Sequence, residues 1–283
     1  MSSIEMTKGD NAVLLIHGLS SSPLEMMSCA KALYRAGFSV RVPHYSTFGF
    51  NTEDPETGVI EPWEKWREEI FNDFRQMKKK YNKVFVVGLC VGAVLTLDLA
   101  KEFKDEIAGL ALLSTALFYD GWAMPWYKNL IPFIPYVSKS IQSYFCYHEK
   151  EPYGVKNEHI RSKIKMSMKK HKVSAAGSAK ITNTGIYEAY LLTKNVRKNL
   201  EKISQPVLIV HSEEDETASV RNVDFLQRNI RSKHIDVLLL KDSYHMITLD
   251  NEKKLVAAEV TRFFNKLSSS HKQEETHVQL SEA

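Results

Sequence analysis

The sequence has little that would place the protein in a membrane or outside the cell. Its 283 residues contain no apolar run close to the roughly 20 residues of a transmembrane helix. The first residues, Met1-Ser2-Ser3-Ile4-Glu5, lack the basic and apolar regions of a secretory signal. Only three cysteines occur, and Cys29, Cys90 and Cys146 have neither the even number of a disulfide framework nor the spacing of a zinc site. We therefore expect a cytoplasmic protein with no metal and no cofactor, in which Cys29 and Cys146 serve in packing.

Over most of the chain, neither positive nor negative charge predominates. The formal net charge is +4, and nothing in the sequence indicates nucleic-acid binding. The exception is Lys156–Lys180, where eight Lys or Arg residues accompany one Glu. We interpret this stretch first as the solvated face of a helix. The alternative is a docking surface for an acidic partner, such as an acyl carrier protein, or for an anionic membrane surface.

Apolar runs alternate with amphipathic helical patterns along most of the chain. Residues 61–81, for example, repeat aromatic and apolar side chains at helical spacing between charged neighbours, which predicts a helix that packs on a sheet. Such alternation is typical of the α/β class, with a largely parallel sheet and helices on both faces. The expected strands are 12–16, 38–43, 83–87, 107–114, 206–210 and 235–240, and the expected helices are 23–37, 61–81 and 93–103.

The alternation stops between about residues 117 and 200. This segment is rich in aromatic residues and prolines before it becomes basic. A long insertion between two strands of a parallel sheet predicts a cap over the carboxyl ends of the strands, where such sheets bind ligands. We therefore predict an α/β core formed by residues 1–116 and 201–267, an inserted helical cap at 117–200, and a disordered polar tail at 268–283.

Cys90 is the candidate nucleophile. It stands in the middle of Gly88-Leu89-Cys90-Val91-Gly92, directly after the apolar run 83–87 and directly before a helical pattern. This is the G-x-S-x-G nucleophile elbow with cysteine in place of serine, and its glycines are needed because the tight turn leaves no room for Cβ atoms. A thiol at a helix N-terminus has its thiolate form favoured by the helix dipole and the free N–H groups. The elbow therefore suits a reactive sulfur.

A base and an acid for this nucleophile occur after two later strands. Asp215 follows the strand expected at 206–210, and His245 follows the strand expected at 235–240. The order nucleophile, acid, histidine is that of α/β-hydrolases, and a thiol nucleophile needs such a base and orienting acid. We rank Asp215 first as the acid. The alternatives are Glu213, Glu214, Asp242 and Asp120.

Acyl chemistry also needs two N–H groups that hold an oxyanion. The first normally belongs to the residue after the nucleophile, which here is Val91. The second is expected from Leu19, in the strand-to-helix turn Ile16–Pro23, where small residues leave backbone donors accessible. We predict a structural role for the neighbouring His17.

These motifs resemble the bacterial carboxylesterase and monoacylglycerol-lipase branch of the α/β-hydrolase superfamily. The resemblance is carried by His17-Gly18 with its serine-rich turn, by Gly88–Gly92, by Asp215 and by Asp242–Asp250. It covers the core at residues 11–116 and 204–266. Ala93 departs from the pattern, because a glycine often closes the elbow in this branch.

The resemblance implies an α/β-hydrolase fold with a helical cap over the acyl site. It implies that Cys90, Asp215 and His245 stand where the family has its serine, aspartate and histidine. It further implies oxyanion donors at Leu19 and Val91, and hydrolysis of short to medium acyl esters. Dienelactone hydrolases and polyhydroxyalkanoate synthases have this fold and use cysteine with His and Asp, so the replacement is compatible with catalysis.

The sequence therefore predicts a carboxylesterase or thioesterase that acts through an acyl-cysteine on a small molecule with an apolar acyl group. A thioester intermediate passes its acyl group to an amine, a thiol or an alcohol as well as to water. An acyltransferase is consequently the second hypothesis. The third is a ligand-binding protein that keeps the fold without catalysis.

Overall fold

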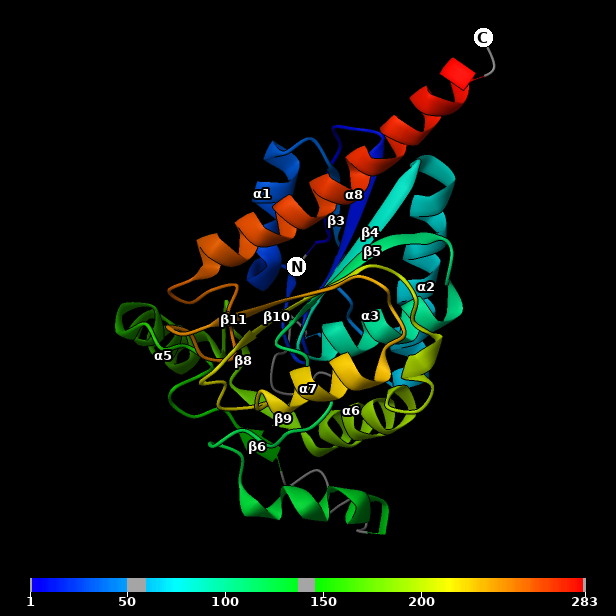
Figure 1. Ribbon diagram of the computed structural model, residues 1–283. Helices are drawn as coiled ribbons and strands as arrows, with labels where there is room; N and C mark the ends of the chain where they lie inside the picture. The colour runs from blue at the N-terminus through cyan, green and yellow to red at the C-terminus, as the bar shows by residue number, and fades with distance from the viewer. Residues whose placement is uncertain (1, 50–59, 137–145, 282–283) are drawn as a thin grey trace.

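A parallel sheet forms the centre of the molecule. The computed structural model describes residues 2–49, 60–136 and 146–281, and its largest sheet has the strand order β1-β3-β2-β4-β5-β10-β11 (Figure 1). All neighbours from β3 to β11 pair in parallel, while β1 pairs antiparallel with β3. The strands are β1 (Ile4–Met6), β2 (Asn11–Ile16), β3 (Ser39–Val42), β4 (Lys83–Leu89), β5 (Ile107–Leu113), β10 (Val207–Ser212) and β11 (Ile235–Leu240).

Helices cover both faces of this sheet, which confirms the predicted α/β-hydrolase fold (Figure 1). On one face, η1 (Pro23–Met26) leads into α1 (Met27–Arg35), which packs against α8 (Lys253–Ser281). The other face is covered by α2 (Trp63–Lys80), α3 (Val91–Glu102) and α7 (Arg221–Asn229). Alternate residues of β2 enter the two cores, because side chains along a strand point to opposite faces.

The segment between β5 and β10, which we call the insertion (residues 114–206), forms elements of its own. Its helices are η2 (Trp126–Tyr136), α5 (Glu158–His171), α6 (Asn183–Val196) and η3 (Leu200–Lys202). Short strands also occur, with β6 (Cys146–His148) paired to β9 (Lys180–Thr182) and β7 (Val173–Ser174) paired to β8 (Gly177–Ser178). The insertion thus contains short strands in addition to the expected helices. Gly177 adopts a φ of 111°, which glycine tolerates and which closes the β7–β8 hairpin.

Residues 137–145 of the predicted cap lie outside the described residues. The tail predicted to be disordered from Ser268 instead continues α8 to Ser281. The helix continues because residues 272–275 are Lys, Gln, Glu and Glu, all good helix formers.

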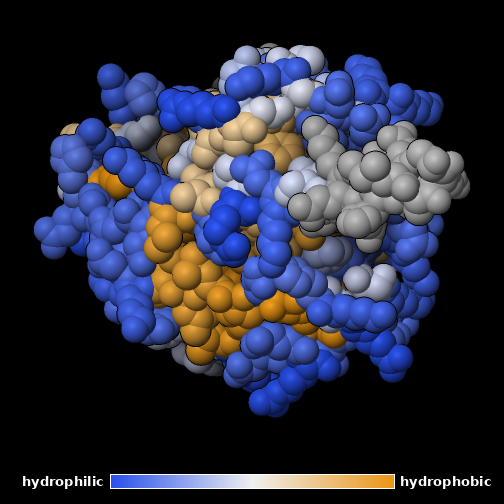
Figure 2. All heavy atoms as spheres, turned by 45° about the horizontal axis from the view of Figure 1, so that its top comes forward, coloured by the Kyte–Doolittle hydropathy of each residue, from blue (hydrophilic) through white to orange (hydrophobic). Residues whose placement is uncertain are grey.

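The surface combines hydrophilic and hydrophobic areas. Figure 2 shows one face on which a continuous hydrophobic area is bordered by hydrophilic residues. Large apolar side chains are also exposed on the edge strand β11, where Val237 and Leu239 are 37% and 40% exposed. Of the helices in the described part of the chain, none has the length and apolar content needed to cross a bilayer.

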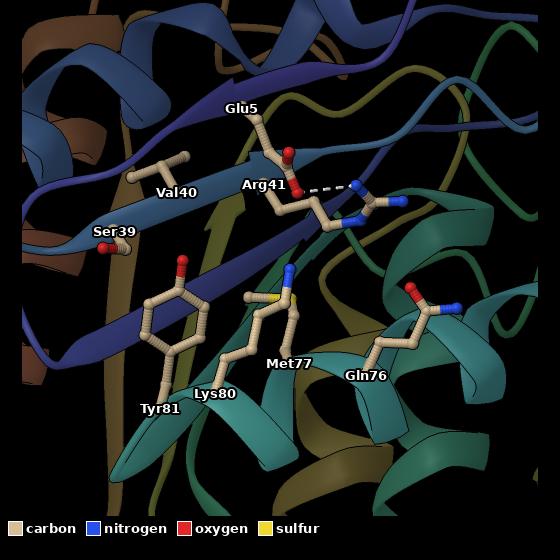
Figure 3. A pocket seen from close by; sticks show the side chains of 8 residues that line it. All are labelled: Glu5, Ser39, Val40, Arg41, Gln76, Met77, Lys80 and Tyr81. Carbon is tan, nitrogen blue, oxygen red and sulfur yellow. Dashed lines mark hydrogen bonds and ion pairs between the residues drawn. The ribbon is translucent and has the colours of Figure 1, made fainter.

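A small cavity of about 20 Å³ lies beside β3 and the end of α2 (Figure 3). Arg41 and Glu5, which form an ion pair of 2.8 Å, are among its lining residues. Tyr81, another lining residue, precedes β4, whereas Cys90 follows it. A seven-residue strand is roughly 23 Å long. This cavity therefore lies near the amino ends of the strands, whereas the elbow lies at their carboxyl ends.

Candidate active site

Cys90 occupies a strained turn between β4 and α3. Its backbone angles are φ 55° and ψ −116°, a conformation that non-glycine residues rarely adopt. The flanking glycines are required by close packing: a Cβ on Gly88 would lie 2.2 Å from the carbonyl oxygen of Gly92, and a Cβ on Gly92 would lie 2.3 Å from that of Ile16. The turn therefore has the geometry that the sequence predicts for a nucleophile elbow.

His245 and Asp215 are in direct contact. Nδ1 of His245 lies 2.8 Å from Oδ2 of Asp215, and the two residues are 5% and 2% exposed. Oδ1 of Asp215 accepts the N–H groups of Thr217 and Ala218 at 2.9 and 2.8 Å. The carboxylate is thereby fixed in place, and it orients the imidazole so that Nε2 is the free ring nitrogen.

The electrostatics of this pair depend on Cys90 as well. Burial lowers the pKa of His245, but the charges of Asp215 and Cys90 and hydrogen bonding to both raise it, and the net pKa lies well above its ordinary value. Burial raises the pKa of Asp215, but the charge of His245 and its hydrogen bond outweigh this and lower it. Nε2 of His245 is buried, with no hydrogen bond of standard geometry among the described residues. The interaction with Cys90 therefore favours a proton on the imidazole.

The predicted oxyanion donors lie in two turns beside the elbow. Leu19 follows β2, and Val91 is the first residue of α3. Within the described residues, neither backbone N–H has an intramolecular acceptor. His17 is fully buried, and its Nε2 accepts the Tyr45 N–H at 3.2 Å while its Nδ1 donates to the Gly18 carbonyl at 2.9 Å. These contacts agree with the structural role predicted for His17.

The sequence of the chain matches a known protein family. Residues 7–252 match the family described as serine aminopeptidase, S33. The chain belongs to this family. It is therefore a hydrolase of the α/β-hydrolase superfamily.

Similar proteins of the family span almost the whole chain. A thermostable monoacylglycerol lipase of Bacillus sp. (strain H-257) is 26% identical over 91% of this chain and 92% of its own length. A carboxylesterase of Bacillus subtilis (strain 168) is 23% identical over 92% and 94%. Among solved structures, the monoacylglycerol lipase of Paleococcus ferrophilus has a TM-score of 0.75 at 17% identity and covers 95% of this chain and 98% of that chain.

The other acids considered from the sequence have different partners in this S33 hydrolase. Asp120 accepts the Ser219 N–H at 3.0 Å. Glu214 pairs with Lys156 at 2.8 Å, and Asp242 lies 3.6 Å from the same ammonium. Among the described residues, the Glu213 side chain forms no hydrogen bond or ion pair. Of the five candidates, Asp215 is the one that contacts His245.

Three residues near the histidine and the cysteine escaped the sequence analysis. Glu216 accepts the His245 N–H at 3.0 Å. Burial and then the charge of Glu216 raise the pKa of Glu149, a residue of the insertion, to about 7. Burial and the charge of Cys90 raise the pKa of Tyr119 well above its ordinary value. The only sequence signal was the position of Glu216 beside Asp215, because the other two residues reach the site through the insertion.

The basic stretch Lys156–Lys180 lies on and around α5. Ile164 and Met168 are buried in the core on the α1 side of the sheet, while the lysines of α5 are exposed. Lys165 forms an ion pair with Glu151. This distribution is that of a helix with one apolar and one solvated basic face.

Proposed function

We propose that this hydrolase cleaves a carboxylic ester or thioester through a covalent intermediate on Cys90. The observation that carries the proposal is the contact of His245 with Asp215 beside a cysteine in a strained turn at a helix N-terminus. In such an arrangement the acid orients the base and the base activates the nucleophile. The names of the similar proteins, monoacylglycerol lipase and carboxylesterase, support an ester as the substrate.

The first half-reaction forms the acyl-enzyme. Nε2 of His245 takes the thiol proton, and Sγ of Cys90 attacks the acyl carbonyl carbon. A C–S bond forms while the carbonyl electron pair moves to oxygen. The N–H groups of Leu19 and Val91 hold this oxyanion, and Asp215 stabilises the imidazolium. When the oxyanion collapses, the bond to the leaving alcohol or thiol breaks, and the leaving group takes the proton from Nε2.

The second half-reaction returns the free enzyme. His245 removes a proton from water, whose oxygen attacks the thioester carbonyl. The second oxyanion collapses to a carboxylic acid, and the Cys90 thiolate leaves and recovers its proton from His245. Each step thus uses the same base and the same pair of N–H donors.

We further propose that residues 117–200 act as the cap and supply part of an apolar acyl site. Leu19 and Phe118 are partly buried apolar residues against the same core as Cys90. Residues of the insertion also contact the turns that carry the proposed site, through the hydrogen bonds from Ser178 to Ser20 and from Met246 to Gly154. An apolar small molecule fits such surroundings better than a charged one.

The test is intact-mass spectrometry after incubation with a panel of acyl esters and acyl thioesters. Wild type is expected to gain the mass of the acyl group, whereas Cys90→Ala gains none and His245→Ala gains it at least about 10³-fold more slowly. The buried thiol of Cys29, whose pKa burial raises to about 12, is a natural internal control. A folded wild type that no substrate labels would contradict the proposal and favour a binding protein.

Transfer to an acceptor other than water is the second candidate, and the sulfur nucleophile favours it. A thioester passes its acyl group readily to amines, thiols or alcohols. An acidic acyl carrier protein would find complementary charge on the exposed lysines of Lys156–Lys180. Product analysis with and without added acceptor separates the two reactions, because transfer gives an acyl-acceptor where hydrolysis gives a free acid.

A further inference from the structure

Glu25 is a buried acid next to the proposed site that the mechanism above does not use. Its side chain lies in η1 and is 1% exposed. Oε1 accepts the N–H of Gly18, and Oε2 accepts the hydroxyl of Ser21. A Cβ built on Gly18 would be 3.4 Å from this Oε1 and 3.5 Å from Cβ of Cys90. The carboxyl and the proposed nucleophile therefore lie against the same residue of the turn.

The local sequence favours a different partner for this carboxyl. Ser22-Pro23-Leu24-Glu25 has the pattern of a capping box, in which the Glu side chain bonds back to the N–H of the capping Ser. In the structure Ser22 caps η1 through Leu24, at 3.4 Å, while Glu25 reaches past Ser22 to Gly18 and Ser21. The carboxyl thus binds the turn and not the start of the helix.

A buried carboxyl at this position lowers the stability of the folded protein, compared with an apolar side chain. Burial raises the pKa of Glu25 to about 7, although hydrogen bonds from Ser21 and Gly18 and the charge of His245 lower it. None of its contacts among the described residues is with Lys or Arg. A buried acid without a basic partner is costly. A side chain that served packing alone would not need a carboxyl here.

His17 holds the opposite side of Gly18. Its Nδ1–H donates to the Gly18 carbonyl at 2.9 Å. That carbonyl shares a planar trans peptide unit with the N–H of Leu19, so the two groups point in opposite directions. With Gly18 fixed at its N–H by Glu25 and at its carbonyl by His17, the direction of the Leu19 N–H is determined.

We propose that Glu25 is a positioning residue for acyl transfer, which aims the Leu19 N–H at the oxyanion by holding Gly18 and Ser21. The inference rests on the proposed function, because an oxyanion forms only if Cys90 attacks a carbonyl. Glu25 touches neither the substrate nor the reacting atoms, and it acts through the turn.

Two reactions of Cys90 separate this role from a general structural one. Iodoacetamide alkylates the thiolate by displacing iodide from a saturated carbon, which forms no oxyanion. A p-nitrophenyl ester acylates it through an oxyanion that needs the Leu19 N–H. Both rates are measured by mass spectrometry with peptide mapping, in a Cys146→Ser background so that only one accessible thiol remains.

Glu25→Ala is expected to slow acylation about 10²-fold, the usual effect of losing one oxyanion donor. Alkylation is expected to change less than about threefold, and Glu25→Gln, which still offers an oxygen to Gly18, is expected to keep acylation within about fivefold of the parent. Ser21→Ala, which removes one of the two hydrogen bonds, provides an intermediate variant if Glu25→Ala does not fold.

Three outcomes would overturn the assignment. Equal loss of acylation and alkylation indicates a general structural role, and unchanged acylation in Glu25→Ala indicates no role. Loss in Glu25→Gln as large as in Glu25→Ala indicates that charge matters more than position. A parent protein that is alkylated but never acylated contradicts the proposed function itself, and this result is distinct from the other three.

Discussion

The backbone N–H of Ser178 donates to the carbonyl oxygen of Ser20 at 2.8 Å. Ser178 belongs to β8 of the insertion, and Ser20 belongs to the turn that contains Leu19. A second hydrogen bond, from Met246 to Gly154, joins the insertion to the loop of His245 at 2.8 Å. The insertion thus contacts both turns that carry proposed catalytic groups, and changes in it should affect chemistry as well as stability.

Gly177→Ala tests the first of these contacts. Gly177 has a φ of 111°, and a Cβ there would lie 2.8 Å from the Ser20 oxygen. We expect the new methyl group to displace the turn and to slow acylation of Cys90 about tenfold or more, since oxyanion geometry is sensitive to small shifts. Stopped-flow measurement of p-nitrophenol release gives the rate.

Gly37→Ala is the matched control for this substitution. Gly37 has a φ of 105°, so alanine meets the same kind of backbone strain, but its Cβ has no neighbour within 4 Å. Both variants should lose about 1 kcal/mol of stability from strain. If the two variants acylate equally fast, the contact of β8 with the turn has no influence on the reaction.

Asp215→Asn tests the proposed acid. The amide keeps the size of the carboxyl but removes the charge that stabilises the imidazolium, so acylation should fall by about 10³–10⁴. Glu214→Gln is the control, because Glu214 neighbours Asp215 in the chain but pairs with Lys156 at the surface. A large loss of acylation in Glu214→Gln, together with a small loss in Asp215→Asn, would indicate that the acid is a residue other than Asp215.

The architecture was predictable because it follows from the local pattern of the chain. Apolar runs such as 235–240 became strands at the expected positions. In a parallel sheet the carboxyl ends of the strands meet at one edge, so residues that directly follow strands were expected to converge. The 2.8 Å contact between His245 and Asp215 agrees with this expectation. Their catalytic roles, and that of Cys90, stay predictions.

The surroundings of the site were not predictable from the sequence. Glu25 and Glu149 look like ordinary surface acids in the chain, and only tertiary packing removes them from water. The insertion posed the same difficulty, because its short strands have only two or three residues, and β6 pairs with β9, which is distant in the sequence. Burial, and not residue type, distinguishes these groups.

Asp250→Ala tests how the insertion is held to the core. Asp250 is fully buried, and its carboxylate accepts the N–H groups of Lys156, Asn157 and Tyr244 at 2.7 to 2.9 Å. Its removal leaves several partly buried donors unpaired, so the free energy of unfolding in urea should fall by about 3 kcal/mol. The exposed Asp242, changed to Asn, should stay within about 0.5 kcal/mol of wild type. Equal stability of the two variants would contradict this function of Asp250.

Glu25→Gln should change the pH dependence of stability. Glu25 keeps its proton in the folded protein to about pH 7, whereas the unfolded chain releases it near the ordinary pKa of 4.5. The folded state therefore binds the extra proton between these values, and the free energy of unfolding falls as the pH rises through them. Since one pKa unit corresponds to about 1.4 kcal/mol, the loss above pH 7 is about 3 kcal/mol.

Glutamine does not ionise, so the variant avoids this loss. Its stability relative to wild type should increase by about 3 kcal/mol between pH 4.5 and 8, as measured by urea unfolding. Other acids with raised pKa, such as Glu149 and Glu216, are present in both proteins and cancel in the difference. A difference that does not vary with pH would show that Glu25 ionises as it does in water.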